Sequence, residues 1–188
     1  LTKSKIPLIY ICKAQINPKT LYLMKIKSFL YLFLVGVFSV SAYSQNVKLL
    51  NIDQLNERIK NGKDSTYVVN FWATWCAPCI KELPHFEKLS AEHKSEKLAV
   101  LLVSLDFKSK LSSAVIPFVE KNQLKTEVYV INEKDQQKFI ERVDQKWEGA
   151  IPATLFYNKE KKIRHFYEKP FETYKDLLDK LASLGLKL

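Results

Sequence analysis

Two cysteines separated by two residues, Cys76 and Cys79, are the side chains whose type and spacing point most directly to chemistry. They lie in the stretch NFWATWCAPCIKELP, residues 70–84. A pair at this spacing can be a redox couple, half of a metal site or a structural disulfide. The chain has 188 residues, so it can bury a sizeable core and does not need a disulfide to hold its fold together.

A zinc site is the first alternative to weigh, and it needs about four protein ligands. Besides the cysteine pair, the sequence downstream of residue 44 offers only His85, His93 and His165. None of these histidines stands at a spacing typical of a metal motif. The sequence therefore predicts no metal site.

A redox couple places different demands on the pair. The attacking sulfur must be a thiolate near neutral pH, so its pKa must fall from about 8.5 to roughly 3.5–7.5. Unpaired N–H groups at the start of a helix favour that charged form. Cys76 is predicted just before a helix and facing solvent, with Cys79 sheltered one turn further in. Pro78 suits the first helical turn, where its missing N–H costs nothing.

The elements that must position this pair follow an α/β order. Residues 66–72 and 97–105 are continuous β-branched, aromatic or aliphatic runs, which predict strands buried on both faces as in a parallel sheet. Apolar residues at every third position predict a helix from Pro78 to about Lys94. The other predicted elements are a helix within 46–60 capped by Asp53, a helix over 112–122, an edge strand over 127–131, a helix over 135–147, a hairpin of strands 154–157 and 163–167, and a final helix from Tyr174. Together they predict a three-layer α/β domain.

The first 44 residues are predicted to lie outside that domain. Met24 opens MKIKSFLYLFLVGVFSVSAYSQ, in which two lysines, an apolar run over 29–40 and small polar residues have the layout of a secretory signal peptide cleaved before Gln45. The apolar run is shorter than the ~20 residues of a membrane span, although an uncleaved anchor is the alternative. Residues 1–23 are expected to precede the true start, and residues 45–188 to form one domain.

Charge and cysteine usage change once that segment is set apart. The formal net charge of the whole chain is +10, but residues 1–44 hold six lysines and no acidic residue, which leaves +4 on the remainder. These charges are interspersed, so they predict a solvated surface and no nucleic-acid binding. Cys12 falls in the removed segment. One cysteine pair then remains, in an exported protein whose surroundings allow disulfides to form.

The stretch VVNFWATWCAPCIKELP, residues 68–84, resembles the thioredoxin superfamily and, within it, the exported TlpA/ResA-like thiol-disulfide oxidoreductases. GAIPAT, residues 149–154, supports the resemblance, because family members carry a cis-proline at the position matching Pro152. The resemblance covers nearly all of residues 47–188. It implies a thioredoxin-like α/β/α domain with a central mixed sheet.

The resemblance also implies roles for individual residues. Cys76 would be the nucleophile, Cys79 the resolving cysteine and Pro152 the cis-proline against which substrate docks. Ile151 would offer its backbone to an extended substrate chain as a short β-pairing edge. The residues implied in substrate binding are Trp75, Ala77, Pro78 and Ile151.

One position departs from cytosolic thioredoxins, which carry a buried acid on the strand before the motif. Here the residue is Asn70, which is usual in the exported branch and cannot act as a base. The proton acceptor for Cys79 is therefore open. Glu82, three residues after Cys79, and Glu148 are the candidates, and each can equally be a solvated surface carboxylate.

The hypothesis is a periplasmic or secreted thiol-disulfide oxidoreductase that reduces protein disulfides, with cytochrome c maturation among its possible pathways. The resemblance implies a membrane thiol carrier as electron donor and no cofactor, and a monomer is expected. An oxidase of the same fold would use the same chemistry. A non-enzymatic binding module with a fixed disulfide is the alternative. A peroxiredoxin-like peroxidase is disfavoured, because its reactive cysteine stands alone in a different local pattern.

Overall fold

The computed structural model describes residues 47–94 and 97–186. The predicted signal peptide and Cys12 lie outside these residues. Within the described part of the chain, no helix is both long and apolar enough to cross a membrane.

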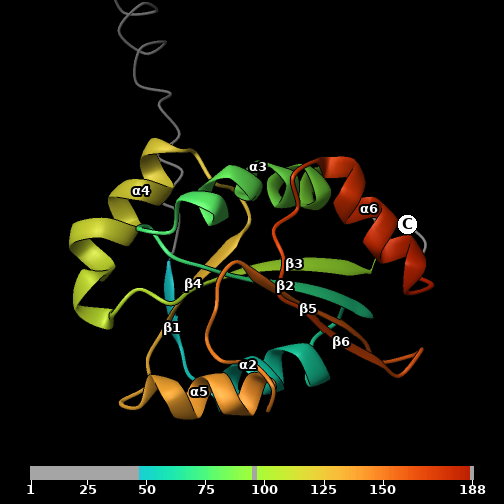
Figure 1. Cartoon of the computed structure of the whole chain (residues 1–188), viewed down its shortest axis with the longest axis horizontal. Coiled ribbons are helices and arrows are strands. Elements are labelled where there is room, and N and C mark those ends of the chain that lie inside the picture. The colour runs from blue at the N-terminus through green and yellow to red at the C-terminus, as the bar shows by residue number, and fades with distance from the viewer. Residues whose placement is uncertain (1–46, 95–96, 187–188) are drawn as a thin grey trace, which may run out of the picture. The chain divides into compact units, whose positions relative to one another are not determined.

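A six-stranded mixed sheet forms the middle layer of the domain, in the order β1-β4-β3-β2-β5-β6 (Figure 1). The first four strands of this order run parallel to one another, β5 runs antiparallel to them, and β6 is antiparallel to β5 and so runs in the direction of the first four. This arrangement confirms the predicted mixed sheet. The strands are β1 (Lys48–Leu50), β2 (Thr66–Trp72), β3 (Leu98–Ser104), β4 (Glu127–Ile131), β5 (Ala153–Asn158) and β6 (Ile163–Tyr167).

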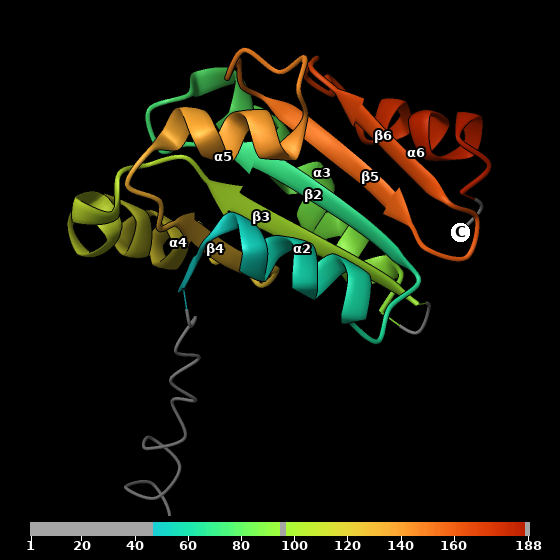
Figure 2. The same cartoon turned by 90° about the horizontal axis from the view of Figure 1, so that it is seen from below.

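Helices cover both faces of the sheet, as the three-layer prediction requires. Figure 1 and Figure 2 show α3, α4 and α6 on one face and α2 and α5 on the other. Each face has its own buried apolar cluster, and the cysteine pair belongs to the cluster under α3. The helices are α2 (Ile52–Asn61), α3 (Ala77–Glu92), α4 (Ile116–Lys121), α5 (Gln136–Val143) and α6 (Tyr174–Ser183).

Strand β2 is the central element that leads into the cysteine pair. Its side chains alternate between the two clusters, with Val68 and Trp72 on the α3 side and Val69 and Phe71 on the opposite side. All four are fully buried, which explains the continuous apolar run in the sequence. The Phe71 ring also packs 4.9 Å from that of Trp147, centroid to centroid. The carboxyl end of β2 is therefore held firmly from both faces.

Two strand predictions need correction. Strand β4 was predicted at the edge of the sheet, but it lies between β1 and β3. The edge is taken by β1, whose three residues pair in parallel with Tyr129–Ile131 of β4. A segment of three residues is too short to show a strand pattern in the sequence, where it was predicted as part of the lead-in to α2.

Two helix predictions also need correction. The segment predicted as one helix over 112–122 is a π-helical turn, Leu111–Val115, followed by α4. Pro117 lies in the first turn of α4, where a residue without an N–H is tolerated. Helix α5 ends at Val143, before the predicted limit. Trp147 instead lies in the following loop, where its indole N–H donates to the Ala150 carbonyl at 2.8 Å.

Helix α2 begins at a different cap from the predicted Asp53. The Asn51 side chain accepts the Gln54 N–H at 2.8 Å, and the Gln54 side chain accepts the Asn51 N–H in return. Asn51→Ala is therefore expected to lower the free energy of unfolding by about 1 kcal/mol, measured by urea denaturation. Glu57→Ala, an exposed change within the same helix, is the control. Equal effects of the two changes would contradict the capping role of Asn51.

Candidate functional site

The cysteine pair lies where β2 has ended and α3 begins. Cys76 is the N-cap residue of α3, as predicted, and it is joined to Cys79 by a disulfide with an S–S length of 2.03 Å. The Cys79 N–H donates to Cys76 Sγ at 3.3 Å. No acidic residue occupies the first turn of α3. The partial positive charge at this helix end is thus aimed at the Cys76 sulfur without an opposing carboxylate in that turn.

The two cysteines differ in exposure, but less than the sequence predicts. Cys76 is 6% exposed and Cys79 is fully buried. The prediction that Cys76 faces solvent openly is therefore wrong for this disulfide form. The cause is a loop distant in sequence, because the Ile151 carbonyl oxygen lies 3.8 Å from Cys76 Sγ.

That loop carries the predicted cis-proline. The Ile151–Pro152 peptide bond is cis, which confirms the prediction from the sequence. Gly149 enters the loop with φ of +90°, a conformation that favours glycine, and a Cβ there would come within 3.0 Å of Ile140 Cδ1. The hydrogen bond that the Trp147 indole donates to the Ala150 carbonyl stabilises the same turn. The loop is thus fixed against the helical layer before it reaches the cysteines.

The residues predicted to contact substrate border the pair from the solvent side. Trp75 is 70% exposed, and Ala77 and Pro78 are exposed as well. Ile151 is half-buried, and its carbonyl oxygen lies 3.8 Å from Cys76 Sγ. Three of these residues therefore adjoin the cysteines in the chain, and Ile151 adjoins Cys76 in space.

The two candidate proton acceptors occupy different environments. Glu148 is exposed. Glu82 is only 1% exposed, and its carboxylate accepts the Asn70 Nδ2–H at 2.7 Å and the Phe171 N–H at 2.8 Å. Burial raises the pKa of Glu82 to about 7, although these two hydrogen bonds favour the charged form. Glu82 therefore lies one helical turn beyond Cys79 with a pKa suited to proton exchange near neutral pH.

Asn70 connects this carboxylate to the strand that carries the cis-proline. Its Nδ2 group also donates to Thr154 Oγ1 at 3.3 Å, and its Oδ1 atom is buried without a hydrogen-bond partner. Asn70 is not a base, but it holds one oxygen of Glu82 in place. Residues on β2, α3 and β5 thereby form one buried polar contact beneath the cysteine pair.

A second polar contact near the pair was not predicted from the sequence. Asp106 is 3% exposed and accepts both the N–H and the hydroxyl of Thr74, at 2.9 and 2.7 Å. The Ser104 hydroxyl donates to the same carboxylate at 2.7 Å. Thr74 and Asp106 each follow the end of a buried parallel strand, β2 and β3, and that shared position is the signal that could have revealed the contact.

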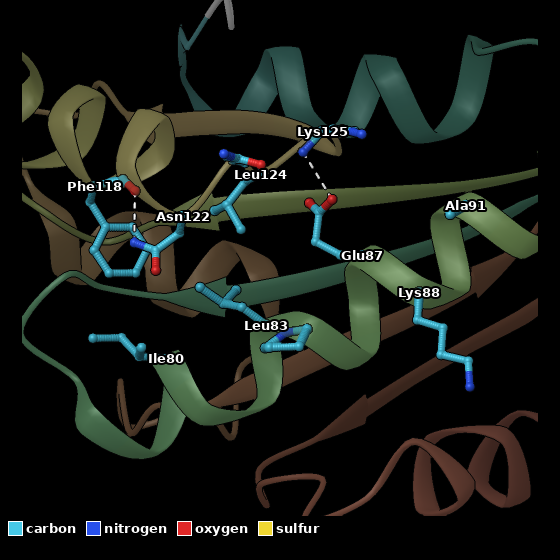
Figure 3. A pocket seen from close by; sticks show the side chains of 11 residues that line it. Ile80, Leu83, Glu87, Lys88, Ala91, Phe118, Asn122, Leu124 and Lys125 are labelled. Carbon is cyan, nitrogen blue, oxygen red and sulfur yellow. Dashed lines mark hydrogen bonds between the residues drawn. The ribbon is translucent and has the colours of Figure 1, made fainter.

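No metal centre is found at the cysteines in the described part of the chain. Within residues 47–94 and 97–186, no three His, Cys, Asp or Glu side chains gather closely enough to hold a metal ion. A groove of about 470 Å³ lies between α3 and the segment that follows α4 (Figure 3). One of its walls carries Glu87, which accepts the Lys125 N–H at 2.8 Å. Ile80 reaches the groove, but neither cysteine lines it.

Comparison with known proteins agrees with this geometry. The model of the AhpC/TSA family matches residues 42–166. The thioredoxin of Coprinus comatus is 31% identical over 105 residues, which are 56% of this chain and 86% of that protein. The thioredoxin-related protein of Neisseria meningitidis serogroup B superposes with a TM-score of 0.55 at 22% identity, over 66% of this chain and 88% of that one, which shows a shared fold.

A further similarity is more local. The thiol-disulfide oxidoreductase ResA of Oceanobacillus iheyensis is 38% identical over 55 residues, which are 29% of this chain and 29% of that protein. The thioredoxin-like protein YneN of Bacillus subtilis is 38% identical over 66 residues, 35% of this chain and 38% of that protein. The chain thus spans about a third of the length of these two relatives.

Proposed function

Since this chain belongs to the AhpC/TSA family of thioredoxin-like proteins, we propose that Cys76 and Cys79 are the redox centre of a thiol-disulfide oxidoreductase. The observation that carries this proposal is the placement of the pair. Cys76 caps α3, Cys79 is buried behind it, and the cis-proline loop lies against the Cys76 sulfur. The similarity to proteins named thiol-disulfide oxidoreductase ResA supports the same reaction.

The reaction begins with the reduced pair. The Cys76 thiolate attacks one sulfur of a substrate disulfide, so that a mixed disulfide forms and the other substrate sulfur leaves as a thiolate. Cys79 then loses its proton and attacks Cys76 Sγ. The Cys76–Cys79 disulfide forms, the second substrate sulfur leaves, and two electrons have passed from the protein to the substrate.

Glu82 is the proposed acceptor of the Cys79 proton. It is buried on the same helix as Cys79, and its pKa of about 7 allows it to take a proton and release it again near neutral pH. Glu148 is exposed, so water competes with it for any proton. In this mechanism Pro152 and the Ile151 backbone border the path along which the substrate chain reaches Cys76.

The proposal extends to the cellular setting. The signal-peptide pattern of residues 24–44 supports export to the periplasm or the exterior, where a membrane thiol carrier would return the protein to its reduced form. Reduction is the proposed direction, cytochrome c maturation is one pathway that fits it, and the protein would act as a monomer. A redox titration against glutathione tests the direction, because a potential near −120 mV would indicate an oxidase and one near −270 mV a reductase.

The activity itself is tested with the reduced wild-type protein. We expect catalytic reduction of insulin disulfides by dithiothreitol, and a Cys76 thiol pKa well below 8.5, measured by the pH dependence of alkylation with iodoacetamide. The physical reason is that the N-terminus of α3 favours the thiolate.

The same measurements address the alternative of a non-enzymatic binding module with a fixed disulfide. Such a module would show no insulin reduction and a Cys76 pKa near that of a free thiol. Either of these results would reject the proposed oxidoreductase activity. A reduced form that does not become oxidised when it is mixed with a protein disulfide would also reject the proposed oxidoreductase.

A further inference from the structure

Two large apolar side chains stand out as exposed in the described part of the chain, namely Trp75 at 70% and Phe107 at 65%. Trp75 directly precedes Cys76. Phe107 follows β3 and was not singled out in the sequence. A single exposed apolar side chain is ordinary, whereas exposed apolar side chains that form one patch mark an interaction site.

The two aromatic residues come from adjacent segments. In the sheet, Trp72 of β2 is paired with Ser104 of β3, and the Leu105 N–H donates to the Trp72 carbonyl at 2.7 Å. Beyond the strands, Asp106 accepts two hydrogen bonds from Thr74. The two segments therefore leave the end of the sheet side by side, and Trp75 and Phe107 are the next residue of each.

This pairing is built on buried structure. The Asp106 carboxylate is 3% exposed and accepts three hydrogen bonds, two from Thr74 and one from Ser104. Because these hydrogen bonds fix the residue before each aromatic side chain, less of the chain has to become ordered when a partner binds. That reduces the entropic cost of association.

The charged residues that directly follow Phe107 in the chain have one sign. Lys108 and Lys110 are exposed in the short helical turn Lys108–Lys110 that follows Phe107. No acidic residue occurs from Phe107 to Val119, and the one acid just before this segment, Asp106, is buried and hydrogen-bonded. Phe107 and the segment that follows it are therefore complementary to a chain that carries both apolar and acidic residues.

We propose that Trp75, Phe107, Lys108 and Lys110 form a docking surface for the substrate chain, selecting disulfides whose cysteine is flanked by an aromatic residue and an acidic residue. The proposal rests on the proposed function and adds the substrate class. The surface is continuous with the redox centre through the Trp75–Cys76 bond. A chain that delivers its sulfur to Cys76 can therefore lay its neighbouring residues across Trp75 and Phe107.

The test uses the full domain and two synthetic peptides, each closed by one disulfide. One peptide has Phe and Asp beside its cysteines, and the other has Ser and Lys at the same positions. We expect the reduced wild type to favour the Phe/Asp peptide in kcat/KM by about tenfold or more. Phe107→Ser is expected to reduce this ratio about tenfold, and the double change Lys108→Ala with Lys110→Ala to reduce it at low salt and less at 0.5 M salt.

Two controls separate docking from a structural effect. Phe107→Leu keeps an apolar side chain and is expected to retain most of the preference. Lys60→Ala removes an exposed charge from α2, on the opposite face of the sheet, and should leave the ratio as in wild type.

The outcomes distinguish the two proposals. If the wild type reduces both peptides with equal efficiency, or if Phe107→Ser retains the wild-type ratio, the docking surface is refuted while the oxidoreductase stands. If the wild type reduces neither peptide and no insulin, the proposed function fails and the docking surface fails with it. A ratio lost in Phe107→Ser and retained in Phe107→Leu supports the surface.

Discussion

Replacing Cys76 with serine is expected to abolish disulfide reduction, whereas replacing Cys79 with serine is expected to trap the substrate on Cys76. The first change removes the attacking sulfur, so turnover should fall by at least about 10³-fold, to the background rate. The second change leaves the attack intact but removes the sulfur that releases the substrate. Insulin reduction measures the first effect. Non-reducing electrophoresis with mass spectrometry detects the mixed disulfide.

Both variants should keep the fold, because serine replaces sulfur by a smaller atom at positions fixed by backbone hydrogen bonds of α3. Far-ultraviolet circular dichroism provides that control. Accumulation of a mixed disulfide in Cys76→Ser, and none in Cys79→Ser, would reverse the assignment of the two roles. No accumulation in either variant would contradict the mechanism.

The second large effect concerns Glu82 and pH. The pKa of this carboxyl is about 7 in the folded protein and 4.5 in its ordinary state, a difference worth ~3 kcal/mol at 1.36 kcal/mol per pKa unit. Between pH 4.5 and 7 the folded protein retains a proton that the unfolded chain has released. The free energy of unfolding should therefore fall as pH rises through this window, and the full cost of the buried charge remains above it.

Glu82→Gln should remove this contribution. The variant is expected to gain on the order of 3 kcal/mol relative to the wild type between pH 4.5 and 8, measured by urea denaturation of the disulfide form. Glutamine fits the site, because its carbonyl can accept the Phe171 N–H while its amide meets the unpartnered Oδ1 of Asn70 after a turn of that side chain.

Glu148→Gln is the matched control, since Glu148 is exposed and its loss should leave the pH dependence as in wild type. The sign of the expected change in the free energy of unfolding shows whether burial or favourable pairing dominates at Glu82. A wild type that becomes more stable from pH 4.5 to 7 relative to Glu82→Gln would show that Glu82 is charged and favourably paired, and would remove the reason to choose it as proton acceptor.

The site was predictable from the sequence where its geometry is local. The start of a helix at Cys76 follows from the residues on either side of it, and Pro78 marks the same boundary. The near-complete burial of Cys76 was not predictable, because it depends on Ile151, seventy-five residues later. The same is true of Glu82, which the sequence left as one of two candidates. Its burial requires the backbone of Phe171, eighty-nine residues away.

The fold, like the site, was predictable from the sequence where its elements are local and was missed where they depend on distant segments. The apolar runs of β2 and β3 were recognisable in the sequence because both faces of each strand are buried. Strand β1 was missed because its three residues are a strand only by pairing with β4. The docking surface inferred around Phe107 also lay outside the sequence prediction, since an exposed aromatic residue has no pattern until the segment beside it is known.

The bond between the two sulfurs closes a ring of only four residues, Cys76 to Cys79, whose backbone is already ordered by a helix. A cross-link over so short a span restricts the unfolded chain little, by less than the ~3 kcal/mol that a fifteen-residue loop would give. The rest of the domain is secured by two apolar clusters, one without the cysteines and one in which they are two of many buried side chains. Opening and closing this bond can therefore repeat in every cycle while the architecture around it persists.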